Sequence, residues 1–263
     1  MTRFLRSGIA LGIALASGQV LSAQTSALYV SGSSGIHVLQ GGAQTNFWAH
    51  ANSGQYNLPI AVFGDVRTTS YISGQQGAQY TLGGVYTGTN YTNTTGNYEY
   101  DGTSDGRNNY ALAYNTGQVF ATDRSWANAN VIFSTMAGDL GISYDRITNT
   151  LWTSGYNTDN VSNWSMTGTL LSSFNSGLGG GQVSLAFDGA DQSLWLYGRG
   201  TDQLWHQYNT SGTQLSTFSV NMNDDVLGAE FNTAPEPASL VLMGTGMLGL
   251  FGVARRRKGT TRA

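Results

Sequence analysis

The sequence predicts an all-β fold, and its composition, its turn residues and an internal repeat all point to it. Charged residues make up 10% of the 263 residues against the usual quarter, while the 36 glycines are about twice the usual share. Fourteen Tyr, ten Phe and six Trp supply the large side chains that strands favour. With abundant Ser, Thr and Asn for turns, this mixture suits many short strands better than long helices.

The repeat is clearest in the second half of the chain. Residues 141–155 and 184–198 align, and the match continues from 165–174 into 209–218. In each copy an aromatic residue precedes an Asp and is followed eight positions later by a Trp; these pairs are Tyr144 with Trp152 and Phe187 with Trp195. An offset of 43 to 44 residues indicates a repeated structural unit.

Three further copies complete the pattern. Residues 60–72 carry the same spacing, with Phe63 and Tyr71 eight positions apart, and residues 111–123 carry Tyr114 and Phe120 with a loop two residues shorter. A fifth copy is divided between the ends of the region: residues 228–232 supply its first strand, and residues 28–39 its second and third. Five units of about 42 residues account for residues 24–234.

Units of this length with four short strands resemble the blades of a β-propeller. We therefore predict a five-bladed β-propeller in which the C-terminal strand Leu227–Phe231 pairs with Ala27–Ser31 and closes the ring. Such closure hides sheet edges that would otherwise pair with other chains. A four-bladed ring would leave residues 28–50 unexplained, and a β-sandwich would not predict the period.

Side chains alternate between the two faces of a strand, so each first strand presents one row to the neighbouring blades. The predicted row is Val62, Ala113, Ser143, Ala186 and Glu230. If this row faces a central channel, the Glu230 carboxylate could bind a cation or a sugar hydroxyl; the alternative is a partly solvated closing strand that tolerates a charge. After the aromatic residue of each first strand, an Asp or Asn is expected to close the turn: Asn115, Asp145, Asp188 and Asn232.

A second candidate site lies in the Asn/Thr/Gly-rich segment 87–107, which we expect to form a long surface loop. Asp101 and Asp105 alternate there with hydroxyls and glycines, the oxygen chemistry that Ca²⁺ prefers, although the segment lacks the bidentate Glu of an EF-hand. A turn without metal is the alternative, and no cofactor is expected elsewhere. The three histidines, His37, His50 and His206, occupy unrelated positions in their units, so structural or surface roles are expected.

The two ends differ from the repeat region. Residues 1–23 begin with two arginines, continue with an apolar run and end on small residues at Ala23, as in a helical, cleaved signal peptide. Seven of the twelve basic residues lie in the two end segments. Between residues 24 and 234 remain five Arg, no Lys and fourteen acidic residues, a net charge of −9, which disfavours nucleic acid as a partner.

Residues 235–263 combine three features in a fixed order. Pro235, Glu236 and Pro237 are followed by an uncharged stretch, 238–254, long enough for a short transmembrane helix, and then by a basic cluster of Arg255, Arg256, Arg257 and Lys258. This order resembles the PEP-CTERM sorting signal of Gram-negative bacteria. The resemblance implies export by way of signal peptidase, transient anchoring in the inner membrane, and processing near the Pro-Glu-Pro motif by the membrane peptidase exosortase.

These observations favour an exported, non-enzymatic protein. The resemblance to PEP-CTERM proteins implies a place at the cell surface or in the extracellular matrix, in association with exopolysaccharide or with other surface proteins. With no Cys, the chain has no thiol nucleophile or zinc finger, and it contains no Gly-x-Ser-x-Gly turn and no phosphate loop. Trp164 and Trp205 are candidates for stacking on sugars, with packing between blades as the alternative. The rival hypothesis is a metal-dependent propeller lactonase or lyase acting on a sugar derivative, which would need partners for Glu230.

Overall fold

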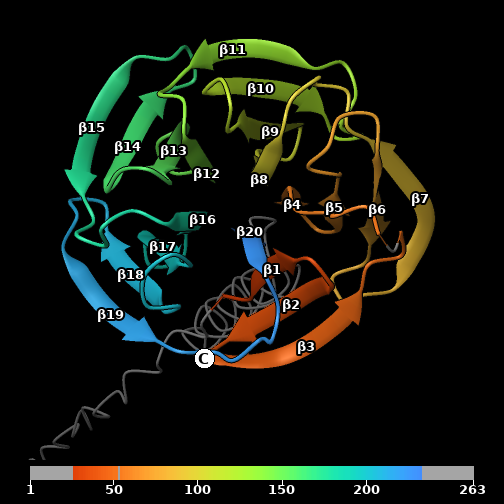
Figure 1. Ribbon diagram of the computed structural model, residues 1–263, viewed down its shortest axis with the longest axis horizontal. Coiled ribbons are helices and arrows are strands. Elements are labelled where there is room, and N and C mark those ends of the chain that lie inside the picture. Colours follow the sequence, from red (N-terminus) through yellow and green to blue (C-terminus); the bar gives the residue numbers. More distant parts are fainter. Residues whose placement is uncertain (1–25, 53, 233–263) are drawn as a thin grey trace, which may run out of the picture.

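The computed structural model describes residues 26–52 and 54–232, and these residues form five four-stranded antiparallel sheets arranged around a central axis (Figure 1). The all-β, five-bladed β-propeller predicted from the sequence is confirmed. Within the described residues there is no helix long and apolar enough to cross a membrane. The predicted signal peptide 1–23, its cleavage residue Ala23 and the predicted transmembrane helix 238–254 lie outside the described residues.

The first blade combines the two ends of the described chain. Its innermost strand is β20 (Val226–Phe231), followed outward by β1 (Leu28–Gly32), β2 (Gly35–Gln40) and β3 (Ala43–Ala49). Leu28 pairs with Phe231 and Ser31 with Gly228. The predicted closure of the ring by the C-terminal strand is thereby confirmed.

The other four blades each use consecutive strands, with the innermost strand first in the chain. They are β4 (Ile60–Val62), β5 (Val66–Thr68), β6 (Gln76–Tyr80) and β7 (Tyr86–Thr92); β8 (Glu99–Ser104), β9 (Asn108–Ala113), β10 (Gln118–Asp123) and β11 (Asn130–Ser134); β12 (Asp139–Asp145), β13 (Thr150–Gly155), β14 (Asn160–Ser165) and β15 (Leu170–Asn175); and β16 (Gln182–Asp188), β17 (Ser193–Gly198), β18 (Trp205–Asn209) and β19 (Gln214–Phe218).

Two predictions about the middle of the chain are wrong. Residues 87–107 are not a surface loop, because they contain most of β7 and all of β8. Consequently Tyr114 follows a second strand, and Phe120 lies in the third strand, β10. The aromatic pattern predicts the wrong strand here because Ser104, and not an aromatic residue, precedes the turn residue Asp105 that follows β8, whereas Tyr114 directly after the next strand resembles the aromatic marker.

Apolar side chains between adjacent blades form the core. Around β13 and β16, for example, Trp152, Leu185 and Phe187 pack in one buried cluster. The inner strands are buried along their length, while the outermost strands, such as β3 and β15, are mostly exposed. The packing of each blade therefore depends on its two neighbours in the ring.

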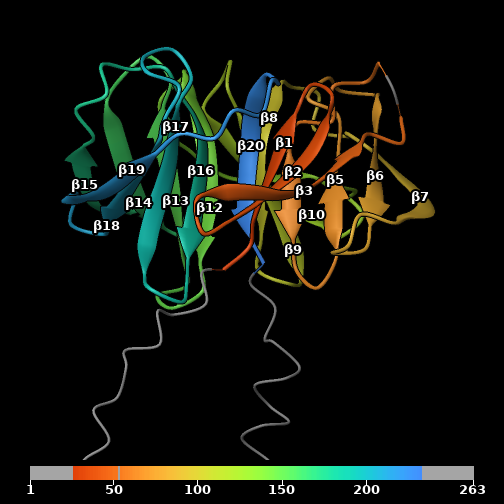
Figure 2. The same ribbon diagram turned by 90° about the horizontal axis from the view of Figure 1, so that it is seen from below.

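The propeller has two distinct faces. The start of β1 and the end of β20 lie on the same side, which we call the chain-end face (Figure 2). The innermost strand β20 starts on the opposite side, beside Tyr156 and Tyr197, and runs toward the chain-end face. We call this opposite side the tyrosine face, after the tyrosines that lie on it.

Candidate functional site

The free edges of the innermost strands meet at the propeller axis, and side chains rather than an open channel cap them. An unpaired backbone N–H buried without an acceptor is costly, so these edges need acceptors. Three side chains of inner strands connect the blades: Asp101, Thr103 and Glu230. Asp101 and Glu230 accept hydrogen bonds from more than one blade, and Thr103 accepts one from a neighbouring blade and donates one to Glu230.

Asp101, on β8, is fully buried at this axis. Its carboxylate accepts N–H groups from three other blades: Ile142 at 3.1 Å, Leu185 at 3.0 Å and Ala229 at 3.0 Å. It also accepts the N–H of Gly102 at 2.9 Å. One side chain therefore connects four of the five blades, which gives it a structural function that its place in a polar segment did not suggest.

Glu230, on β20, completes the cap on the chain-end side of Asp101. Its carboxylate accepts the N–H of Ser104 at 2.8 Å, the N–H of Val62 and the hydroxyl of Thr103. Thr103 in turn accepts the N–H of Tyr144 at 2.9 Å. The inward-facing position of Glu230 is as the sequence predicted, but Thr103 and not Ala113 occupies the corresponding position of the third blade.

Burial controls the protonation of both acids. It raises the pKa of Glu230 to about 8, against the opposing effects of Thr103, Val62 and Ser104. Burial also raises the pKa of Asp101, while the four N–H groups favour its ionised form. Because N–H donors surround these oxygens, a cation could bind them only by displacing those donors. The described residues contain no group of three His, Cys, Asp or Glu placed to hold a metal ion.

The remaining sequence candidates have local roles. Asp105, the second predicted calcium ligand, closes the turn after β8 by accepting the N–H groups of Arg107 and Asn108, both at 2.7 Å. Asp145 and Asp188 close their turns in the same way, as predicted. Asn115, in contrast, lies after a second strand, and Asp105 is its true counterpart.

The histidines and tryptophans take part in packing and hydrogen bonding. His37 contacts Asp224 at 2.9 Å, His50 contacts the carbonyl of Gly32, and His206 contacts Asp202. Trp205 is fully buried and stacks on Phe218. Trp164 is half-buried and donates its indole N–H to Thr153 at 3.0 Å.

The raised pKa of Glu230 predicts that the domain is more stable in mild acid. Below pH 4.5 the folded and unfolded chains are both protonated at this group; above it, the unfolded chain releases the proton first, so stability falls as pH rises through about 8. The loss amounts to at most about 5 kcal/mol. Chemical denaturation at pH 5 and pH 8.5 should show this decrease, and Glu230→Gln should reduce it. An unchanged slope in that variant would contradict the buried, protonated state.

The face opposite the chain ends carries an arc of tyrosines around the axis. Tyr71, Tyr114 and Tyr156 come just after the second strands of three blades. Tyr197 lies near the end of β17, the second strand of a fourth blade. Ring contacts connect the arc: Tyr71 to Tyr100 at 5.3 Å, Tyr100 to Tyr114 at 5.8 Å, and Tyr114 to Tyr156 at 6.0 Å. Tyr56 and Tyr98, both about half exposed, extend it on the side of Tyr71.

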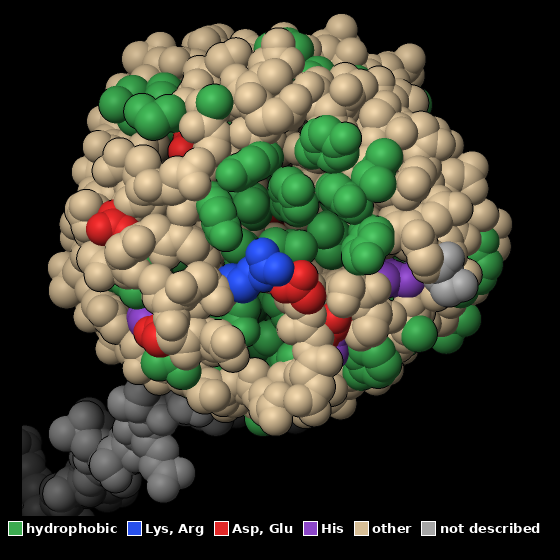
Figure 3. All heavy atoms as spheres, viewed as in Figure 1, with side chains coloured by type: hydrophobic (Ala, Val, Ile, Leu, Met, Phe, Trp, Pro, Cys, Tyr) green, Lys and Arg blue, Asp and Glu red, His purple; other side chains and the backbone are tan. Residues whose placement is uncertain are grey.

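This surface combines apolar rings with polar groups that can meet a ligand. Figure 3 shows hydrophobic side chains gathered around the centre of the face, with basic and acidic side chains in their midst. Arg199 and Asp225 form an ion pair on this face and border a polar pocket of about 360 Å³ beside Tyr156 and Tyr197. The hydroxyls of the arc make no hydrogen bond to other described residues, and are therefore available to a hydroxylated ligand.

The sequence carries a signal for this arc. Tyr71, Tyr114, Tyr156 and Tyr197 are spaced by 43, 42 and 41 residues, close to the blade period. The predicted strand positions of Tyr71 and Tyr114 are wrong, since both follow their strands, and the recurrence of Tyr at one position in four blades is the sequence signal for the arc. In the first blade the corresponding loop holds Ser33 and Ser34, which bind Asp224.

Comparisons with known proteins agree with the fold and identify the tail. The family described as the PEP-CTERM protein-sorting motif matches residues 233–258. Among solved structures, a chain of a nidogen/laminin complex is similar, with a TM-score of 0.54 and 14% identity over 78% of this chain and 98% of that chain. A streptogramin B lyase gives a TM-score of 0.47 and 14% identity, over 76% of this chain and 67% of that chain.

A third structure, virginiamycin B lyase from Staphylococcus aureus, gives a TM-score of 0.46 and 13% identity over 72% of this chain and 64% of that chain. No curated protein matches this sequence. At these identities the first likeness supports the propeller fold alone.

The protein is therefore a five-bladed β-propeller that is exported to the cell envelope. More particularly, the chain carries a PEP-CTERM sorting signal, with Pro235, Glu236 and Pro237 and the basic residues Arg255, Arg256 and Arg257 inside the matched segment, which makes it a substrate for exosortase.

Proposed function

We propose that this protein is a non-enzymatic surface or extracellular-matrix module whose tyrosine face binds a neutral polysaccharide. The observation that carries this proposal is the arc of tyrosines around the axis, whose phenol hydroxyls make no hydrogen bond to another residue within 26–52 and 54–232. Aromatic rings pack against the apolar C–H faces of sugars, and a phenol hydroxyl beside each ring can exchange hydrogen bonds with sugar hydroxyls.

Charge supports a neutral polymer over an anionic one. The region between residues 24 and 234 has five Arg, no Lys and fourteen acidic residues. On the tyrosine face, Arg199 is paired with Asp225 at 2.7 Å and is therefore not free to bind an anionic sugar without breaking that pair. A net negative surface repels polyuronates and nucleic acids.

The placement of the chain ends also supports a binding role. The described chain ends at Asn232 on the chain-end face, one residue before the matched sorting segment, whereas the arc of tyrosines lies on the opposite side. While the sorting segment holds the protein at the membrane, the tyrosine face is therefore on the side away from the point of attachment. If exosortase cuts the chain near the Pro-Glu-Pro motif, the released propeller would keep the tyrosine face unchanged.

The alternative is a metal-dependent lactonase or lyase with its centre at the axis. Such an enzyme needs carboxylates with free oxygens to hold the metal. Here the oxygens of Asp101 and Glu230 already accept backbone N–H groups. The other inner positions of the row that contains Glu230 hold no carboxylate: they are Val62, Thr103, Ser143 and Ala186. We infer that these acids hold the strands together rather than catalyse a reaction.

The binding proposal predicts that removing two rings weakens polysaccharide binding at least tenfold. The expected change corresponds to about 1.4 kcal/mol, the amount that two aromatic contacts supply. The double variant Tyr114→Ala, Tyr156→Ala should be retained less by the neutral fraction of the polysaccharide secreted by the producing cell. The acidic fraction should not retain the wild-type chain.

Tyr144→Ala is the matched control, since Tyr144 is also half-buried but lies at the end of β12 on the chain-end face. It should bind like the wild type. Equal retention of all three proteins, or retention by the acidic fraction alone, would contradict the proposal.

A further inference from the structure

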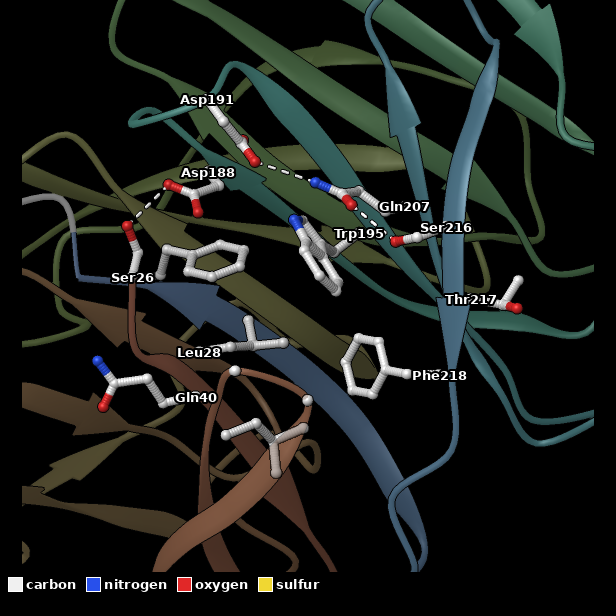
Figure 4. A pocket seen from close by; sticks show the side chains of 14 residues that line it. Ser26, Leu28, Gln40, Asp188, Asp191, Trp195, Gln207, Ser216, Thr217 and Phe218 are labelled. Atoms are coloured by element: carbon white, nitrogen blue, oxygen red, sulfur yellow. Dashed lines mark hydrogen bonds between the residues drawn. The ribbon is translucent and has the colours of Figure 1, made fainter. Parts of the chain in front are cut away.

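A pocket of about 440 Å³ opens at the junction where the last blade meets the first, and we call it the closing-junction pocket. Its walls come from β17 and β19 on one side and from β1, β20 and the β2–β3 turn on the other (Figure 4). Trp195, Phe218 and Phe231 supply aromatic surface, and Asp188, Asp191 and Gln207 supply polar groups. This volume and this mixture are typical of sites for small molecules.

The pocket exists because the closing junction is packed less tightly than three other junctions. In those three, a glycine with positive φ in the turn before the outermost strand lies directly on an aromatic ring of the preceding blade. A Cβ at Gly84 would come 2.5 Å from Trp48, one at Gly212 would come 2.6 Å from Phe174, and Gly168 lies comparably close to Phe133. At the closing junction, a Cβ on Gly42 would remain 3.9 Å from Phe218.

Trp195 differs from its counterpart in the neighbouring blade for the same reason. Trp152 occupies the corresponding position of β13 and is 1% exposed, packed beside Phe174. Trp195 is only partly buried and lines the pocket, held edge-to-face against Phe218 at 5.2 Å and Phe231 at 6.0 Å. Its indole N–H is fixed by Ser193 at 2.9 Å, so the ring is pre-oriented.

Two carboxylates give the pocket its charge. Asp188 is 5% exposed; its Oδ1 accepts the Ser26 hydroxyl at 2.9 Å, and no described residue hydrogen-bonds its Oδ2. Asp191 is exposed and is held by Gln207 at 3.0 Å. Among the described residues that line the pocket, none is basic. A buried carboxylate beside aromatic rings favours a cationic partner, both by charge and by cation–π attraction.

We propose that the closing-junction pocket binds one residue of a protonated amino sugar, with the pyranose ring packed on Trp195 and its ammonium group near Asp188 and Asp191. The apolar face of the sugar matches the aromatic wall, and the ammonium matches the two carboxylates. This site is separate from the tyrosine face in position and in ligand charge. Because it spans the junction that closes the ring, its occupation stabilises the fold.

The test is titration of the full chain, in a detergent without a sugar headgroup, with a tetramer of β-1,4-linked glucosamine. Calorimetry and tryptophan fluorescence should detect binding and a rise in Tm. The N-acetylated tetramer and the neutral glucose tetramer should bind at least tenfold more weakly, since both lack the ammonium. Trp195→Ala and Asp188→Asn should each reduce binding of the glucosamine tetramer at least tenfold.

Two further variants keep the proposal falsifiable if a buried change impairs folding. Asp191→Asn alters an exposed side chain and should weaken binding while leaving circular dichroism unchanged. Trp164→Ala removes a half-buried Trp from another blade and should bind normally, as should the Tyr114→Ala, Tyr156→Ala variant. Absence of binding, equal binding of the three tetramers, or normal binding by the Trp195 and Asp191 variants would overturn the proposal without affecting that for the tyrosine face.

Discussion

An Asp101→Ala variant is expected to lose on the order of 5 kcal/mol of folding stability, and therefore to be largely unfolded near physiological temperature. The substitution leaves the N–H groups of Ile142, Leu185 and Ala229 buried with no acceptor, and each such group costs about 1–3 kcal/mol. The total approaches the full stability of a typical domain. Thermal and urea denaturation followed by circular dichroism would measure it.

Asp105→Ala supplies the matched comparison four residues away. Asp105 also accepts two N–H groups, but in a turn that water reaches, so its loss should cost only about 1 kcal/mol, as for a helix cap. Calcium and chelator should leave the Tm of the wild type unchanged. Similar costs for the two variants, or a rise in Tm with calcium that Asp101→Asn abolishes, would refute the assignment of Asp101 as a structural acceptor.

Deleting the closing strand, Val226–Phe231, is expected to abolish cooperative unfolding altogether. The strand buries Val226, Leu227 and Phe231, worth about 1.5–3 kcal/mol each, and its loss exposes the edge of β1 and removes Glu230 from the axis. The first blade would keep only three strands. Because the chain has no cysteine, no disulfide could close the ring instead. Differential scanning calorimetry should show no unfolding peak.

Deletion of residues 233–263 instead is the control, because the five sheets and their buried clusters all lie within the described residues. That shorter chain should melt close to the full chain. A synthetic peptide of residues 226–232 should restore a transition to the strand-deleted protein by adding back the missing strand. A cooperative peak without the peptide would show that the ring does not depend on this closure.

Most of the architecture was predictable because the sequence repeats in units that each bury the same face. The blade number, the period and the divided first blade all followed from recurrent aromatic residues before Asp and from the position of residues 228–232. The third blade was predicted one strand too late, because β8 ends in Ser104 where the other innermost strands have an aromatic residue before the turn, and because the buried Asp101 gives it the composition of a surface turn. A local pattern cannot reveal that a polar strand is buried at an axis.

The candidate site was less predictable, since its parts come together only when the ring forms. The sequence predicted Glu230 as an unusual inner residue. Its partners Val62 and Ser104 belong to other blades and contribute backbone N–H groups, which cannot be predicted from residue type. The looseness of the closing junction likewise depends on a spacing between Gly42 and Phe218 that only the structure provides. The arc of tyrosines, in contrast, could be predicted from the sequence, because Tyr recurs at intervals close to the blade period.

The most direct test of the account is amide hydrogen exchange of the full chain with and without the neutral polysaccharide. We predict that exchange slows in the loops that carry Tyr71, Tyr114 and Tyr156, while β8 and β20 stay unchanged whether calcium or chelator is present. Slower exchange confined to β8 and β20, dependent on a metal ion, would contradict the account and place the functional site at the axis.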